Sequence, residues 1–181
     1  MFKIKNKLLI PKKNSGFTLI ELVVVIVILG ILSITALPKY INLKSDANIA
    51  IMSGAIGAIK SSVSLFKSKA LTSGSGFSTQ VEFSGVKGSN YQPWAATASA
   101  TSFSANYSSP PEIFEGAGLN VEDWAYRIYV ASGSYAVVAS PRNLLDKAEP
   151  AESEVKATNC YFIYHWKASG EPLLTTISSG C

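Results

Sequence analysis

A single carboxylate, Glu21, stands near the start of an apolar stretch that runs from Phe17 to Leu37. An ionised side chain inside a membrane helix costs on the order of 3 kcal/mol on insertion scales, and such groups usually persist because they take part in function. At the end of a helix the same carboxylate would lie among the lipid headgroups, where the cost is smaller. Energetics alone leave both interpretations open, so the surrounding residues must decide.

The stretch 17–37 is long enough to cross a membrane, because a helix that rises about 1.5 Å per residue spans a hydrocarbon core of about 30 Å over this length. All charges before it are lysines, and without them the formal net charge of +4 changes sign. This unequal distribution excludes nucleic-acid binding as the reason for the basic composition. Positive charge ahead of a first span holds that flank in the cytoplasm, so residues after Leu37 should lie outside the inner membrane.

A cleaved secretory signal followed by a soluble secreted domain is one alternative, with Ala36 as its small-residue cleavage site. Two features argue against it. The apolar run exceeds the usual length of roughly 7–15 residues, and it contains Glu21. The two interpretations predict different mature N-termini.

The sequence Gly16-Phe17-Thr18-Leu19-Ile20-Glu21, followed by residues 22–32 without a polar side chain, resembles the prepilin motif of type IV pilins. The resemblance implies that a prepilin peptidase/methyltransferase cuts between Gly16 and Phe17 and methylates Phe17. It also implies that Glu21 guides assembly. The expected product is a structural subunit rather than an enzyme: a homo-oligomer in a helical filament, built by the pilus assembly machinery of the inner membrane.

Within that family the chain looks most like the mannose-sensitive haemagglutinin (MSHA) class of type IVa pilins, on the run 22–32 and on residues 36–43, 45–47, 68–70 and 123–124. That class implies attachment to external surfaces or glycans, cell adhesion and biofilm formation. Before assembly the chain would be a single-pass protein among inner-membrane lipids, with a periplasmic C-terminal domain, and afterwards part of an extracellular pilus. A type II secretion pseudopilin, which would share the start of the mature chain, is the second alternative.

Five segments are expected along the chain: a cleaved leader (1–16), a membrane and filament-core helix (17–37), its amphipathic half (38–71), a variable, mostly irregular connection (72–120) and a C-terminal sheet region (121–181). Gly30 and Pro38 predict a helix kink, since proline frees the carbonyl four residues back. In the amphipathic half, apolar residues recur at three- and four-residue steps and should face a sheet. They are Met52, Ala55, Ile56, Ile59, Val63, Phe66 and Ala70, with Lys44, Asn48, Lys60 and Lys67 on other faces.

Four β-prone runs follow, at 126–130, 135–139, 160–166 and 173–177, and they predict an antiparallel sheet packed on the helix. Within the connection, 81–83 is expected to add one short strand. The fold class is therefore α+β, and it matches the ladle fold of type IV pilins. Gly54 and Gly57 inside the helix indicate either close backbone packing or simple tolerance of glycine.

Cys160 and Cys181 are the two cysteines of the chain. A metal site would need more ligands at closer spacing. Outside the cytoplasm a disulfide is expected, and type IV pilins resemble this chain in having such a bond near the C-terminus. Closing a loop of this size contributes roughly 3 kcal/mol in the chain-entropy model.

Few other residues could carry chemistry. His165, the one histidine, has no acid or nucleophile near it in sequence and is expected to be structural. The acidic run 146–154 could ligate calcium, as in related pseudopilins, but its spacing fits no loop motif, so a solvated charged surface is expected. Asn106-Tyr107-Ser108 fits a glycosylation sequon that carries little weight here. No phosphate loop, catalytic triad or metal motif is present in the sequence, and no cofactor is expected.

Overall fold

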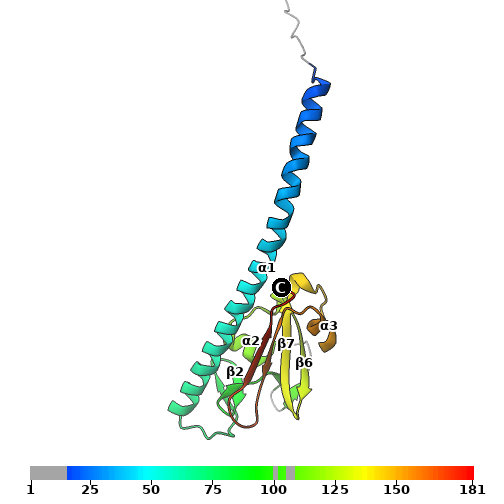
Figure 1. Ribbon diagram of the computed structural model, residues 1–181. Helices are drawn as coiled ribbons and strands as arrows, with labels where there is room; N and C mark the ends of the chain where they lie inside the picture. Colours follow the sequence, from blue (N-terminus) through cyan, green and yellow to red (C-terminus); the bar gives the residue numbers. More distant parts are fainter. Residues whose placement is uncertain (1–15, 100–101, 105–108) are drawn as a thin grey trace, which may run out of the picture. The chain divides into compact units, whose positions relative to one another are not determined.

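The structure is a computed structural model that describes residues 16–99, 102–104 and 109–181 (Figure 1). Leader residues 1–15 and the sequon at 106–108 lie outside the described residues. The chain forms two compact units, Met1–Ile41 and Asn42–Cys181, which are described separately. The longest element, helix α1, is assigned from Leu19 to Thr72 and contributes to both units.

In the first unit, the side chains of residues 19–36 are all exposed. Two hydroxyls bond back to the helix: Ser33 Oγ donates to the Leu29 carbonyl at 2.7 Å, and Thr35 Oγ1 donates to the Leu32 carbonyl at 3.0 Å. Such back-bonding keeps hydroxyls satisfied in apolar surroundings. The kink expected at Gly30 and Pro38 stays a prediction.

In the second unit, α1 buries one face, as the sequence predicted. Its buried apolar residues are Met52, Ala55, Ile59, Phe66 and Ala70, with Ile56 and Val63 partly buried beside them. The three- and four-residue spacing places these side chains on one side of the helix, where they join the core against the sheet. Gly54 and Gly57 lie on exposed parts of the helix surface, and a Cβ added at either position would have no heavy atom within 4 Å. Within the subunit, therefore, neither glycine is required by close packing.

The predicted four-stranded sheet is confirmed: β6 (Trp124–Ala131), β7 (Ser134–Pro141), β8 (Tyr161–His165) and β9 (Leu173–Ile177) pair in sequence order, antiparallel throughout. Figure 1 shows β6 and β7 side by side. The turn between them is formed by Ser132 and Gly133, both with positive φ (50° and 76°). Two positive-φ residues give the tight turn whose twist matches the paired strands.

The connection at 72–120 is more regular than predicted. It contains a three-stranded sheet of β1 (Val81–Phe83), β2 (Val86–Ser89) and β3 (Gln92–Pro93), a hairpin of β4 (Thr97–Ser99) and β5 (Ser102–Ser104), and helix α2 (Glu112–Ala117). The sequence revealed only the strand at 81–83, because strands of two to four residues are too short to show a sequence period.

Tight turns with positive φ make this meander possible, at Ser84-Gly85 and at Asn90-Tyr91. Buried side-chain amides then fix it to the loop between β8 and β9: Gln92 Nε2 donates to the Gly170 carbonyl at 2.8 Å, and Asn90 Nδ2 to the Ala168 carbonyl at 3.0 Å. These side-chain hydrogen bonds add to the few ladder hydrogen bonds that such short paired strands can make.

The core lies between α1, α2 and the four-stranded sheet. The ring of Phe114 on α2 lies 5.4 Å from that of Tyr126 and 6.1 Å from that of Phe162, and Phe162 also meets Trp124 at 5.2 Å. Tyr164 is fully buried, and its hydroxyl donates to the Pro93 carbonyl at 2.8 Å. Burial raises the pKa of this phenol well above its ordinary value. Short helices complete the unit: η1 (Val121–Asp123), η2 (Arg142–Leu144) and α3 (Glu152–Ala157).

Candidate processing, assembly and disulfide sites

The bond between Gly16 and Phe17 lies in backbone without regular structure, just before α1 begins at Leu19. Gly16 is exposed, and a Cβ added there would meet no heavy atom within 4 Å. The Phe17 side chain is 80% exposed. A peptidase acting at this bond would therefore have both flanking residues accessible within the first unit.

Glu21 closes the first turn of α1. Its Oε2 accepts from the Thr18 backbone N–H at 2.8 Å and from Thr18 Oγ1 at 2.7 Å, while the Glu21 N–H donates back to Thr18 Oγ1 at 3.3 Å. This is a capping box, in which a threonine and a glutamate three positions later satisfy each other's amides. The sequence analysis missed this role, although the Thr-x-x-Glu spacing was its signal.

The capping contacts give Glu21 a structural role within its own helix. A carboxylate in the first turn is also stabilised by the positive end of the helix dipole, by about 0.3–1 kcal/mol. A helix cap can therefore account for a carboxylate at this position without any partner from another chain. A role in assembly needs a test that separates charge from capping.

Beyond Glu21, residues 22–32 are exposed and carry no polar side chain. Residues 19–36 are long and apolar enough to cross a membrane, and none of them is buried. Residues 43–72 pass the same test of length and composition, but they are partly buried because they pack against the sheet region. The exposed first segment fits a membrane anchor, whereas the second is the core helix of a folded domain.

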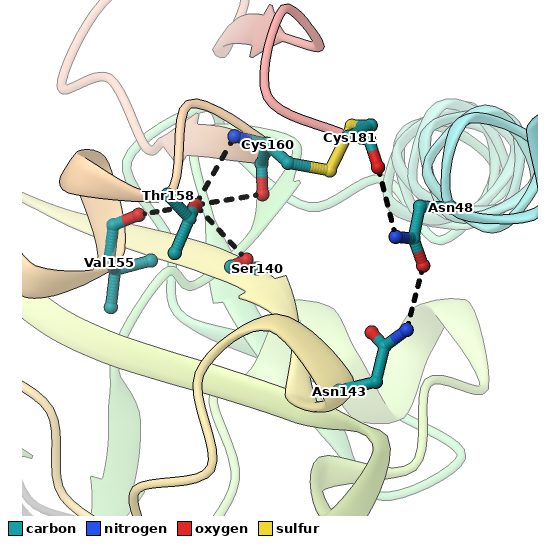
Figure 2. Close-up of a disulfide and its surroundings, with 7 residues drawn as sticks. All are labelled: Asn48, Ser140, Asn143, Val155, Thr158, Cys160 and Cys181. Atoms are coloured by element: carbon teal, nitrogen blue, oxygen red, sulfur yellow. Dashed lines mark hydrogen bonds between the residues drawn. A yellow bond between two sulfur atoms is a disulfide. The ribbon is translucent and has the colours of Figure 1, made fainter. Parts of the chain in front are cut away.

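The predicted disulfide is present: Cys160 and Cys181 are bonded, with their Cα atoms 4.7 Å apart (Figure 2). Thr158 organises the Cys160 side of the bond. Its Oγ1 accepts from the Cys160 N–H at 3.2 Å and lies 2.8 Å from the Val155 carbonyl, to which it donates. On the other side, the Gly180 N–H donates to the Asn159 carbonyl at 2.8 Å. Gly180 and Cys181 are thus tied to the segment before β8.

The burial of Asn48 differs from the sequence prediction. Asn48 was expected away from the packed face of α1, yet its side chain is 1% exposed. Its Nδ2 donates to the Cys181 carbonyl at 3.1 Å, and its Oδ1 accepts from Asn143 Nδ2 at 2.9 Å, as Figure 2 shows. Burying an amide is tolerated only with such partners, and they come from parts of the chain that the helix period does not reveal.

Comparisons with known proteins match part of the chain. Residues 11–37 match the family model for the prokaryotic N-terminal methylation motif. The chain is 39% identical over 56 residues to type II secretion system core protein G of Pseudomonas aeruginosa, and 42% identical over 53 residues to type IV narrow pilus major component PilA5 of Thermus thermophilus. These alignments cover 31% and 29% of this chain and 39% and 46% of the two relatives, less than half of either. No solved structure matches the chain.

The chain is type IV pilin-like. The family model covers residues 11–37, and the arrangement of a long helix followed by a four-stranded antiparallel sheet is consistent with the type IV pilin fold. An apolar anchor of this kind fits a precursor held in the inner membrane.

In the acidic run 146–154 of this pilin-like chain, two of the glutamates form ion pairs with lysines. Glu154 pairs with Lys147 at 2.7 Å and accepts from the Ala151 N–H at 2.7 Å, capping α3. Both contacts, the lysine first, lower the pKa of Glu154. Glu152 pairs with Lys156 one turn later. Among the described residues, no three histidine, cysteine or acidic side chains gather as a metal site would require.

His165 lies in β8 and is 6% exposed. Its Nε2 lies 2.7 Å from Ser134 Oγ at the start of β7. Burial, and then the charge of Lys167, lower the pKa of this imidazole, against an opposing contribution from a hydrogen bond to the Ala131 backbone. The neutral ring therefore ties two neighbouring strands together at the turn end of the sheet.

Proposed function

We propose that this protein is a structural subunit of a type IV pilus, cut between Gly16 and Phe17, methylated at Phe17 and polymerised through α1 into a helical filament. The observation that carries the proposal is the helical segment 19–36, which lies within the methylation motif matched at residues 11–37 and exposes every side chain. Such a surface must be covered by lipid or by other helices. Identical helices from many subunits, joined by contacts that do not close, would cover it in an open helical filament.

A pseudopilus of a type II secretion system is the second candidate, favoured by the similarity to the core protein G. The Cys160–Cys181 disulfide favours the pilus, because major pseudopilins generally lack this pair of cysteines. The further expectation is that of the MSHA-like class: attachment to surfaces or glycans, and biofilm formation, by the outward-facing sheet region.

Processing is tested by the mass of the mature N-terminus. Cleavage by the prepilin peptidase should leave Phe17 first, heavier by about 14 Da after methylation. An N-terminus at Leu37, as a secretory signal peptidase would leave, contradicts both the pilus and the pseudopilus. An unmodified Phe17 would contradict the methylation alone.

For Glu21 we propose that its charge guides a subunit into the filament by attracting the amine of Phe17 on a neighbour, since a charge pair is stronger in apolar surroundings than in water. Three variants separate this from capping. Glu21→Gln keeps the capping hydrogen bonds and removes the charge, Glu21→Val removes both, and Thr18→Val removes the cap partner and keeps the charge.

Filaments are counted by electron microscopy in a strain without wild-type subunit, after each variant has been found in the inner membrane. If the charge guides docking, both Glu21 variants should give few or no filaments and Thr18→Val should give many. If Glu21 only caps the helix, Glu21→Gln should assemble normally while Glu21→Val and Thr18→Val fail together.

A further inference from the structure

We propose that the Cys160–Cys181 disulfide is a redox-sensitive latch for the first turns of α1 in the second unit, residues 43–51, and that it acts through Asn48. With the bond formed, the docked part of the helix begins at Asn48. With the bond reduced, it begins at Met52, one turn later. This inference does not depend on the proposed function.

The first step is that Asn48 alone holds these turns. Among residues 43–51 it is the one buried side chain, since Ser45 is half-buried and the others are exposed, including Leu43, Ile49 and Ile51. The next buried position on the same face is Met52. Whatever weakens the contacts of Asn48 therefore releases residues 43–51, while Met52, Ala55 and Ile59 keep the rest of the helix in the core.

The second step is that the partner of Asn48 depends on the disulfide. Asn48 Nδ2 donates to the main-chain oxygen of Cys181 (Figure 2). Strand β9 ends at Ile177, and beyond it residues 178–181 make two backbone hydrogen bonds, from Gly180 to Asn159 and from Cys181 to Ser178. The covalent tie that holds Cys181 beside Asn48 is the disulfide to Cys160.

Reduction by a dithiol breaks the disulfide bond. A dithiol reductant transfers two electrons and two protons, the S–S bond is replaced by thiols on Cys160 and Cys181, and the reductant becomes a disulfide. Once Cys181 can move away, the amide of Asn48 is left buried against the domain without its acceptor. An unpaired buried amide is costly, so the helix turns around it should open to water.

Hydrogen–deuterium exchange on the full chain in detergent micelles tests the latch, with the protein oxidised or reduced by dithiothreitol. Peptides covering residues 43–51 should exchange about tenfold faster after reduction, the change expected for one lost buried hydrogen bond. Peptides from 55–66 and from β6 and β7 should change much less. Equal acceleration in all of these peptides, or none in 43–51, would overturn the proposal.

Three variants show whether Asn48 carries the effect. Asn48→Leu should exchange fast at 43–51 even when oxidised, and reduction should add nothing, because the two changes remove the same contact. Asn143→Ala, at an exposed site, removes one of the two Asn48 hydrogen bonds and should give an intermediate rate. Ser45→Ala is the control in the same segment and should behave as wild type.

The proposal fails if reduction accelerates residues 43–51 by the same factor in Asn48→Leu as in wild type, since the disulfide would then act without Asn48. If Asn48→Leu does not fold, Asn143→Ala still decides: this variant keeps the bond from Asn48 to Cys181, so reduction should still accelerate exchange at residues 43–51, and no acceleration would overturn the proposal.

Discussion

The two halves of α1 are both long and apolar enough to span a membrane, yet they have opposite surroundings. In the first, residues 19–36 expose every side chain. In the second, a stripe from Met52 to Ala70 is buried against the sheet region. The difference in sequence is one of period rather than of content, because residues 22–32 are apolar on all sides whereas residues 43–72 alternate apolar and polar faces. A helix that is apolar all round needs partners that its own subunit does not supply.

The largest expected effect comes from placing the same charge in each half. Ile59, 1% exposed, contributes to the core, and Ile59→Asp should lower the free energy of unfolding by more than about 4 kcal/mol, because an unpaired charge would be buried. Ile28→Asp should leave that free energy unchanged but oppose membrane insertion by about 3 kcal/mol. Denaturant unfolding followed by tryptophan fluorescence, and membrane fractionation, measure the two. A stably folded Ile59→Asp would contradict the assignment of this half to the core.

The disulfide comes next. Reduction, or replacement of Cys160 and Cys181 by serine, should destabilise the second unit by roughly 3 kcal/mol, since the unfolded chain regains the freedom of the closed loop. The helicity of residues 19–36 should not change. Thiol labelling of denatured, non-reduced protein should give no signal. Full labelling of both cysteines would show that the disulfide does not form.

Glycine substitutions give a smaller effect, of opposite sign at two sites. A Cβ at Gly88 would lie 2.1 Å from the Gln92 carbonyl oxygen and 2.6 Å from the Phe66 ring, so Gly88→Ala should destabilise by about 1–3 kcal/mol. At Gly57 the added methyl meets nothing, and Gly57→Ala should stabilise the helix by about 1 kcal/mol. Denaturant unfolding measures both. A loss of stability in Gly57→Ala would reveal close packing on that face of α1.

The smallest effect is the pH response of His165. Because its pKa is lowered in the folded protein, the unfolded chain binds the proton more readily, and stability should fall as pH drops below the ordinary histidine value near 6.5. His165→Gln should flatten the part of this fall that begins near pH 6.5. Residues 22–36 contain no ionisable side chain, so their helicity provides the internal reference. An unchanged pH profile in the variant would show that other groups cause the response.

Much of the architecture follows from the sequence, because it is written in local patterns. The apolar run 17–37, the stripe from Met52 to Ala70 and the β-prone runs that became β6 to β9 each have a clear period or a continuous composition. The confirmed pairing of Cys160 with Cys181 follows because the chain has no third cysteine. The motif at Gly16, Phe17 and Glu21 was equally visible, while its processing stays a prediction.

Tertiary structure decided what depends on contacts between distant segments. The strands of the 72–120 connection are too short for a period and are fixed by Asn90 and Gln92, which bond to the loop between β8 and β9. Because Asn48 is polar, the apolar pattern of the helix predicted that it would lie away from the buried face. Only the arrival of Cys181 and Asn143, far along the chain, satisfies its amide and allows it to be buried. Local periodicity cannot report a hydrogen-bond partner that folding brings from elsewhere.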